Sequence, residues 1–153
     1  MSDSAGGTTG IGADVEALQS SIIAFVREFG LHQPDMTPCG VAVSVSQAHA
    51  LSELGEAEAL TQSDLGSRLR LSKSTVSRLV GQLQERGWVH RDKGRPDDGR
   101  VVQLRLTDAG VRIHHRLAGA RRDRMRQLLE RVPEAERQTV LHALKLLTEA
   151  ADD

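Results

Sequence analysis

Small hydroxyl side chains and basic side chains are concentrated in one short stretch of this chain, between residues 72 and 78. The stretch reads Ser-Lys-Ser-Thr-Val-Ser-Arg and opens a segment whose apolar residues recur at helical spacing. Short hydroxyl side chains let a helix backbone approach base edges and phosphates, and Arg78 is long enough to reach a guanine edge or a phosphate. The candidates for contact with a DNA duplex are Ser72, Lys73, Ser74, Thr75, Ser77 and Arg78.

A second basic segment follows this predicted helix. Residues 93–100 read Lys-Gly-Arg-Pro-Asp-Asp-Gly-Arg and join two stretches, 88–91 and 101–106, that are expected to pair as β-strands. A narrow minor groove concentrates negative potential and attracts an inserted guanidinium group. Arg100 at the tip of this hairpin is the candidate for that role, and Arg95 is the alternative. The cations expected to neutralise phosphates without reading sequence are Arg68, Arg70 and Lys93.

Purely structural interpretations compete with these assignments. Ser72 stands where the N-cap of a helix is expected, and Ser77 could be an ordinary surface residue. The hairpin tip could be solvated without touching DNA. Trp88 fits a wedge beneath the hairpin better than a platform for a stacked base.

The distribution of charge separates the segments more clearly than the net charge of −1 does. Residues 1–60 carry one basic and eight acidic side chains, residues 61–106 ten basic and five acidic, and residues 107–153 nine basic and eight acidic. The local balance is therefore −7, +5 and +1. The positive segment, residues 61–106, is also the segment that has the DNA-reading pattern. This coincidence supports DNA binding, because a local basic patch governs attraction to phosphate.

Spacing and capping signals predict the elements that position these segments. Apolar residues at three- and four-residue spacing indicate helices over 13–29 and 46–58, with a short helix from 61 before the reading helix 72–86. Thr107 is the expected N-cap of a long helix to about residue 131. Pro133 is expected in the first turn of a last helix, with these residues facing inward: Val140, Leu141, Leu144 and Leu147.

This order predicts a mainly α fold with a small β-hairpin wing, a winged helix-turn-helix of about six helices. We expect a disordered tail over 1–12, an N-terminal dimerisation helix and loop over 13–45, a DNA-binding region over 46–106 and C-terminal dimerisation helices over 107–150. A homodimer is expected because a single compact domain does not need a long helix projecting from a hairpin. Each chain would bury the other's apolar stripes.

Cysteine count and hydropathy indicate the compartment. The single cysteine excludes an intramolecular disulfide and fits a reducing cytoplasm. No apolar run reaches membrane-spanning length, and the start of the chain lacks the pattern of a signal peptide. We therefore expect a cytoplasmic protein without a membrane partner.

Residues 61–110 resemble the MarR family of bacterial winged helix-turn-helix regulators. The resemblance rests on Leu-Gly-Ser-Arg-Leu at 65–69, the stretch 72–80, Leu-Gln-Glu-Arg-Gly-Trp-Val at 83–89, Asp98-Gly99-Arg100, and the closure Leu-Arg-Leu-Thr-Asp-Ala-Gly at 104–110. It implies a homodimeric regulator, usually a repressor, that binds a pseudo-palindromic operator and responds to a small molecule, a metal or an oxidant. It also implies that Asp98 pairs with Arg100 and that an effector cavity lies between helices one, two and five.

Other functions have weaker support. Cys39 could sense oxidants, but it lies in a Pro-Cys-Gly loop without a basic neighbour in sequence, so an inert thiol is favoured. His49, His114 and His115 raise metal sensing, yet adjacent histidines on a helix point about 100° apart. No phosphate-binding glycine loop or nucleophile motif is present, so no enzyme, catalytic residue, metal or cofactor is expected. An activator remains an alternative to a repressor.

Overall fold

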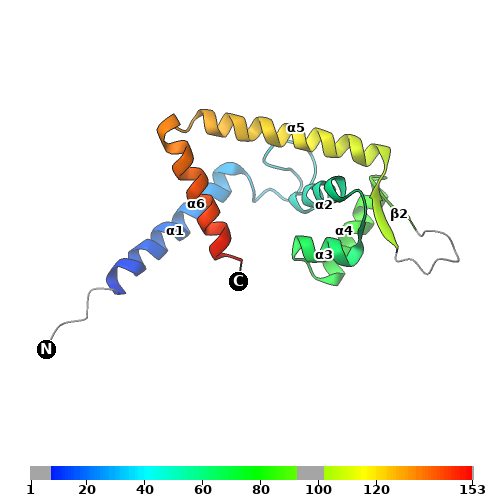
Figure 1. Ribbon diagram of the computed structural model, residues 1–153, viewed down its shortest axis with the longest axis horizontal. Helices are drawn as coiled ribbons and strands as arrows, with labels where there is room; N and C mark the ends of the chain where they lie inside the picture. The colour runs from blue at the N-terminus through cyan, green and yellow to red at the C-terminus, as the bar shows by residue number, and fades with distance from the viewer. Residues whose placement is uncertain (1–7, 93–101, 153) are drawn as a thin grey trace.

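The computed structural model describes residues 8–92 and 102–152. In order, the elements are α1 (Thr8–Phe29), α2 (Val45–Ala57), β1 (Leu60–Thr61), α3 (Gln62–Leu69), α4 (Lys73–Glu85), β2 (Val89–Asp92), β3 (Gln103–Leu106), α5 (Asp108–Glu130), the 3-10 turn η1 (Glu134–Glu136) and α6 (Arg137–Ala150). Helix α5 runs along the molecule, with α2, α3, α4 and the strands near its first residues and α6 beyond its last (Figure 1). The mainly α winged helix-turn-helix fold is confirmed.

Polar side chains at the first residues of the helices explain where several of them begin. Ser44, Thr61, Ser72 and Thr107 each accept a hydrogen bond from the backbone N–H three residues later. These bonds satisfy N–H groups that have no partner inside the helix. Ser44 and Gln47 form a complete capping box, because the Gln47 side chain also accepts from the Ser44 N–H.

The three strands form one antiparallel sheet in the order β1-β3-β2. In β2 and β3, Val89 lies opposite Leu106 and Asp92 lies opposite Gln103. Strand β1 was not predicted: it pairs Leu60 with Leu104 over only two residues, too few to give an alternating pattern. The hairpin is therefore joined to the helical core through β1, which pairs with the outer edge of β3.

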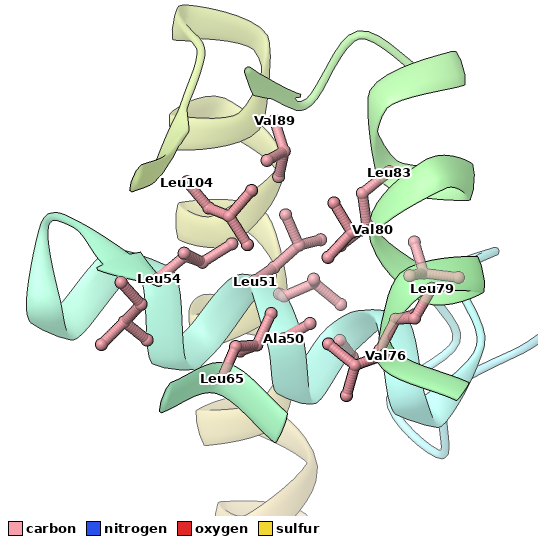
Figure 2. Close-up of a cluster of buried hydrophobic side chains, with 14 of the residues drawn as sticks. Ala50, Leu51, Leu54, Leu65, Val76, Leu79, Val80, Leu83, Val89 and Leu104 are labelled. Carbon is pink, nitrogen blue, oxygen red and sulfur yellow. The ribbon is translucent and has the colours of Figure 1, made fainter. Parts of the chain in front are cut away.

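The core surrounds α2, whose Ala50 and Leu51 have no exposed surface. Figure 2 shows α2 side chains meeting Leu65 of α3, the apolar stripe of α4, and Val89 and Leu104 of the hairpin. Leu117 of α5 is also buried in this cluster. One core thus holds the reading helix and the base of the hairpin in a fixed relation.

Several predicted boundaries were wrong. Helix α1 begins at Thr8, so residues 8–12 are helical and not a disordered tail; residues 1–7 lie outside the described residues. Strand β2 begins at Val89 and not at Trp88. Pro133 has extended ψ of 137° and precedes η1, so the last helix begins only at Arg137.

The inward-facing prediction for the last helix is also wrong for a single chain. No residue of α6 is buried, and the predicted inward residues Val140, Leu141, Leu144 and Leu147 are 37–52% exposed. The apolar face of α1 is exposed as well, because 44–58% of the surface is exposed at Val15, Leu18, Ile22 and Phe25. These two apolar faces are not covered by the chain itself.

Candidate nucleic-acid interface

Helix α4 separates its buried and exposed side chains by face. Its buried stripe consists of Val76, Leu79, Val80 and Leu83. Most of the predicted contact residues are exposed, namely Ser72, Lys73, Ser74, Ser77 and Arg78, whereas Thr75 is half-buried. The structure therefore brings the predicted reading residues together at the N-terminal end of one surface helix.

Ser72 has a structural role in this arrangement. Its Oγ accepts the Thr75 N–H at 3.4 Å and lies 2.9 Å from the Thr75 hydroxyl and 3.2 Å from the Ser74 hydroxyl. The structural alternative for Ser72, a helix cap, is thus present. A contact between Ser72 and DNA remains a prediction.

The turn between α3 and α4 is tight. Arg70 adopts the left-handed conformation (φ 52°, ψ 40°), and its N–H donates to the carbonyls of Gly66 and Ser67. A Cβ on Gly66 would lie 3.1 Å from Cγ2 of Val76, so glycine allows the two helices to approach closely. These contacts fix the angle at which α4 leaves the turn.

Two of the predicted phosphate contacts have carboxylate partners within the chain. The Arg68 guanidinium lies 3.0 Å from Glu53, and Arg70 pairs with Asp152 beyond the end of α6. The Arg68 side chain is 48% exposed and the Arg70 side chain is 70% exposed. A phosphate would therefore compete with these carboxylates, which lowers what each contact can contribute.

The base of the wing is tied to the helices by polar contacts. Arg91 of β2 donates to Gln84 of α4 and to Gln62 of α3, both at 3.1 Å. Arg105 lies 3.3 Å from Asp92 on the neighbouring strand. The wing residues Lys93, Arg95, Asp98 and Arg100 lie outside the described residues, so their predicted roles are not tested.

The junction between the wing and α5 explains the Leu-Thr-x-x-Gly closure in the sequence. The Thr107 N–H donates to the Trp88 carbonyl, the Thr107 hydroxyl donates to the Gly87 carbonyl, and Thr107 Oγ1 accepts the Gly110 N–H. A Cβ on Gly110 would lie 2.0 Å from the Trp88 carbonyl oxygen. Only glycine therefore permits this crossing of α5 over the hairpin.

A polar groove of about 580 Å³ runs along α4 beside the first residues of α2. Thr75, Arg78 and Gln82 line it from α4, and the N-cap Ser44 together with Ser46 and Gln47 lines it from the start of α2. Gln82 and Gln47 were not among the predicted site residues, because Gln82 lies beyond the first two turns of α4. The Ser44-x-x-Gln47 spacing of a capping box was a local signal that could have identified Gln47.

A separate cavity of about 250 Å³ lies among the end of α1, the loop before α2, α2 and α5. Its lining is mainly apolar and also contains Cys39, His49, Arg121 and Arg124. The Cys39 sulfur is 3.0 Å from the Thr37 hydroxyl. The helices match those expected around an effector cavity.

The histidines do not converge on this cavity. His49 lines it, whereas the His114 ring packs against Gly55, where a Cβ would lie within 2.7 Å of three ring atoms. In the described part of the chain, no cluster of three or more His, Cys, Asp or Glu side chains could hold a metal ion. In the same residues, no helix is both long and apolar enough to cross a membrane.

Comparisons with known proteins identify the family. The MarR family model matches residues 43–101. The chain is 30% identical over 105 residues to the HTH-type transcriptional regulator YdgJ of Bacillus subtilis, covering 67% of the chain and 62% of that relative. It is 31% identical over 115 residues to an HTH-type transcriptional regulator of Mycobacterium leprae, covering 75% of the chain and 74% of the relative.

Solved structures agree with this assignment. A MarR family protein from Bacillus stearothermophilus is similar with a TM-score of 0.67 at 25% identity, covering 97% of this chain and all of that one. FabT of Streptococcus pneumoniae, solved in complex with DNA, has the same fold, with a TM-score of 0.66 at 21% identity and coverage of 96% and 99%. The chain belongs to the MarR family of helix-turn-helix transcription regulators, and not to a family of enzymes.

Proposed function

We propose that this protein is a homodimeric repressor that binds a pseudo-palindromic DNA operator in the cytoplasm. The observation that carries the proposal is the exposed face of α4, which presents hydroxyl and basic side chains. The opposite face of α4 is an apolar stripe that is buried in the core. In this proposal, α4 enters the major groove and the wing, with Arg100 or Arg95, enters the adjacent minor groove. The DNA-bound FabT structure supports the choice of duplex DNA as the partner.

The uncovered apolar faces of α1 and α6 support the dimer. In water, half-exposed Leu, Ile, Val and Phe side chains along a whole helix are unfavourable, and a second copy of the chain would bury them. Two reading helices in one dimer would then contact half-sites about one helical turn of DNA apart, roughly 34 Å. This spacing predicts a two-fold symmetric operator.

Release by a small effector is the third part of the proposal. The 250 Å³ cavity contacts α5, which continues towards α6, and α2, which packs on the reading helix. Its apolar lining with two guanidinium groups suits a small apolar molecule that carries an acidic group. Cys39 lines the same cavity, so a response to oxidants through this thiol is the second candidate.

Selection from a random duplex library with the purified protein tests the proposal. The expected result is enrichment of one inverted repeat, bound by two chains and resistant to random competitor DNA. Binding that competitor abolishes and that has no preferred sequence would contradict a specific regulator. Small carboxylic acids that dissociate the selected duplex from the wild type, but not from a Met125→Trp variant with a filled cavity, would support the effector site.

A further inference from the structure

A chain of amide contacts fixes the orientation of a glutamine on the exposed side of α4. The Ser44 N–H donates to Oε1 of Gln47 at 3.3 Å, and Nε2 of Gln47 donates to Oε1 of Gln82 at 3.3 Å. A backbone N–H can only donate, so it assigns the Gln47 oxygen and leaves the Gln47 nitrogen to face Gln82. Gln82 must therefore accept with its oxygen and turn its NH2 group away from Gln47.

The burial of Gln47 makes this orientation hard to reverse. Gln47 is only 6% exposed and belongs to the capping box that begins α2. Turning its amide over would leave the Ser44 N–H facing an NH2 group, which cannot accept. Gln82 is exposed in the groove, and within the described residues no protein acceptor binds its NH2 group.

The position of Gln82 brings this donor to the reading side of α4. Gln82 follows Arg78 by four residues and Thr75 by seven, so the three side chains form one row along the helix. The same groove contains Arg78 and Arg86 but also Asp35 and Glu85. The two positive and two negative side chains make the lining of the groove formally neutral, which favours a neutral base edge over a phosphate as the partner of Gln82.

We propose that Gln82 is a further DNA-contacting residue, a fixed hydrogen-bond donor for an acceptor on the duplex, and that Gln47 is its positioning residue. The favoured acceptor is a base edge in the major groove, guanine O6 or N7 or thymine O4, and a phosphate oxygen offers the same chemistry. A free glutamine can accept from adenine with its oxygen and donate to it with its NH2 group. In Gln82 the bond from Gln47 already uses one lone pair of the oxygen and turns the NH2 group outward, which favours donation to the duplex. This inference rests on the proposed DNA-binding function.

Near-isosteric variants at residue 82 test the contact. Gln82→Glu keeps an oxygen for Gln47 Nε2 but directs a second, negatively charged oxygen at the DNA, so operator affinity should fall about 10- to 100-fold. Gln82→Met removes the donor without adding charge and should lower affinity about fivefold or more. Gln127→Ala, an exposed glutamine of α5, is the control and should bind as the wild type does.

A variant of the positioning residue tests the orientation. Gln47→Glu still accepts the Ser44 N–H but has no NH2 group, so the Gln82 amide should turn over and present its oxygen to the DNA. In selection from a random duplex library, one position of the operator should then change to a base with an amino donor, adenine or cytosine. In a Gln82→Met background, Gln47→Glu should leave the preference unchanged. A merely structural role for Gln47 would change thermal stability but not base preference.

The outcomes separate this inference from the proposed function. If the wild type and Gln127→Ala select no sequence, the proposed function fails. If they select an operator and both Gln82 variants bind it as tightly as the wild type, only the Gln82 assignment is overturned. Equal weakening by Gln82→Met on all duplexes would keep the contact and identify the acceptor as phosphate. If Gln47→Glu does not fold, the two Gln82 variants still decide the contact.

Discussion

At the scale of single residues, Arg78 is the residue most clearly expected to recognise the base sequence of the operator. It is exposed on α4, one turn after Ser74, and it lines the polar groove. Replacing Arg78 by alanine should weaken binding to the selected operator by roughly 1–3 kcal/mol, because a good arginine contact with a base edge contributes about that much. Fluorescence anisotropy with operator and random duplexes measures the loss.

The control for Arg78→Ala is Arg126→Ala on α5. Arg126 has a 62% exposed side chain and pairs with Asp123, three residues earlier on the same helix. It should bind the operator as the wild type does. An Arg78→Ala variant that discriminates operator from random DNA as well as the wild type does would remove Arg78 from the reading face.

Gly110 permits a second residue-scale prediction, about stability. Gly110→Ala would place a Cβ 2.0 Å from the Trp88 carbonyl oxygen, and that backbone cannot move without breaking the Thr107 bond to Trp88. The free energy of unfolding should fall by about 2 kcal/mol or more. Gly119 lies on the same helix, and a Cβ there would meet nothing within 4 Å. Gly119→Ala should therefore raise the free energy of unfolding by about 0.5–1 kcal/mol. Thermal unfolding of both variants measures the difference, and equal effects would contradict the close approach at Trp88.

Residue-scale prediction from the sequence succeeded where the interaction is local. The caps at Thr61, Ser72 and Thr107 use groups only three residues apart, so the sequence reveals them directly. The bond between Gln47 and Gln82 spans 35 residues, and the pair of Arg70 with Asp152 spans 82. Neither has a signature in sequence, because only the packing of whole helices brings the partners together.

At the scale of secondary-structure elements, Ser72 combines two roles that one pair of variants can separate. Ser72→Ala removes the cap of α4 and should lower the free energy of unfolding by about 0.5–2 kcal/mol. Ser72→Asp retains a good cap and adds a favourable charge at the helix N-terminus, so the stability should be kept.

DNA binding by the Ser72 variants decides which role matters. If Ser72 faces the duplex, the added carboxylate of Ser72→Asp should lower operator affinity by about tenfold or more through repulsion by phosphates. Denaturant unfolding and anisotropy on the same two samples measure both quantities. Wild-type affinity of Ser72→Asp would leave Ser72 as a cap and nothing more.

Element boundaries were less predictable than element types. The reading helix and α5 were found within one or two residues, because caps and long apolar repeats mark them. Helix α1 extends back to Thr8 through Thr-Thr-Gly-Ile-Gly, a stretch whose composition favours a loop. Strand β1 depends entirely on its pairing with Leu104, so no local pattern could predict it.

At the scale of the whole molecule, the chain divides into a part that buries its apolar side chains in one core and a part that leaves them exposed. Helices α2, α3 and α4 share one core with the sheet and Leu117 of α5, whereas α1 and α6 leave large apolar side chains in solvent. Ile22, Ile23 and Phe25 of α1 are 46–49% exposed, and Leu144 and Leu146 of α6 are just over half exposed. The sequence predicted these stripes correctly as apolar, but a single chain does not bury them.

The dimer hypothesis therefore makes a prediction that concerns assembly and not folding. Leu144 is 52% exposed and contributes nothing to the described core, so Leu144→Glu should leave the single chain folded. At a dimer interface the added carboxylate would be buried without a partner, which costs several kcal/mol and should dissociate the chains at micromolar concentration. Sedimentation equilibrium measures the mass, and Gln138→Glu on the same helix, already polar and exposed, is the control.

Loss of the dimer should weaken binding to the full operator more than binding to a single half-site. A monomer offers one reading helix, so Leu144→Glu should bind a single half-site about as the wild type does but lose the gain from a second half-site on the same duplex. Comparing full and half operators thus separates a failure of assembly from damage to the reading face. If Leu144→Glu stays dimeric, α6 does not form the interface. If instead it is monomeric and still binds the full operator with wild-type affinity, two-fold recognition by a dimer is excluded.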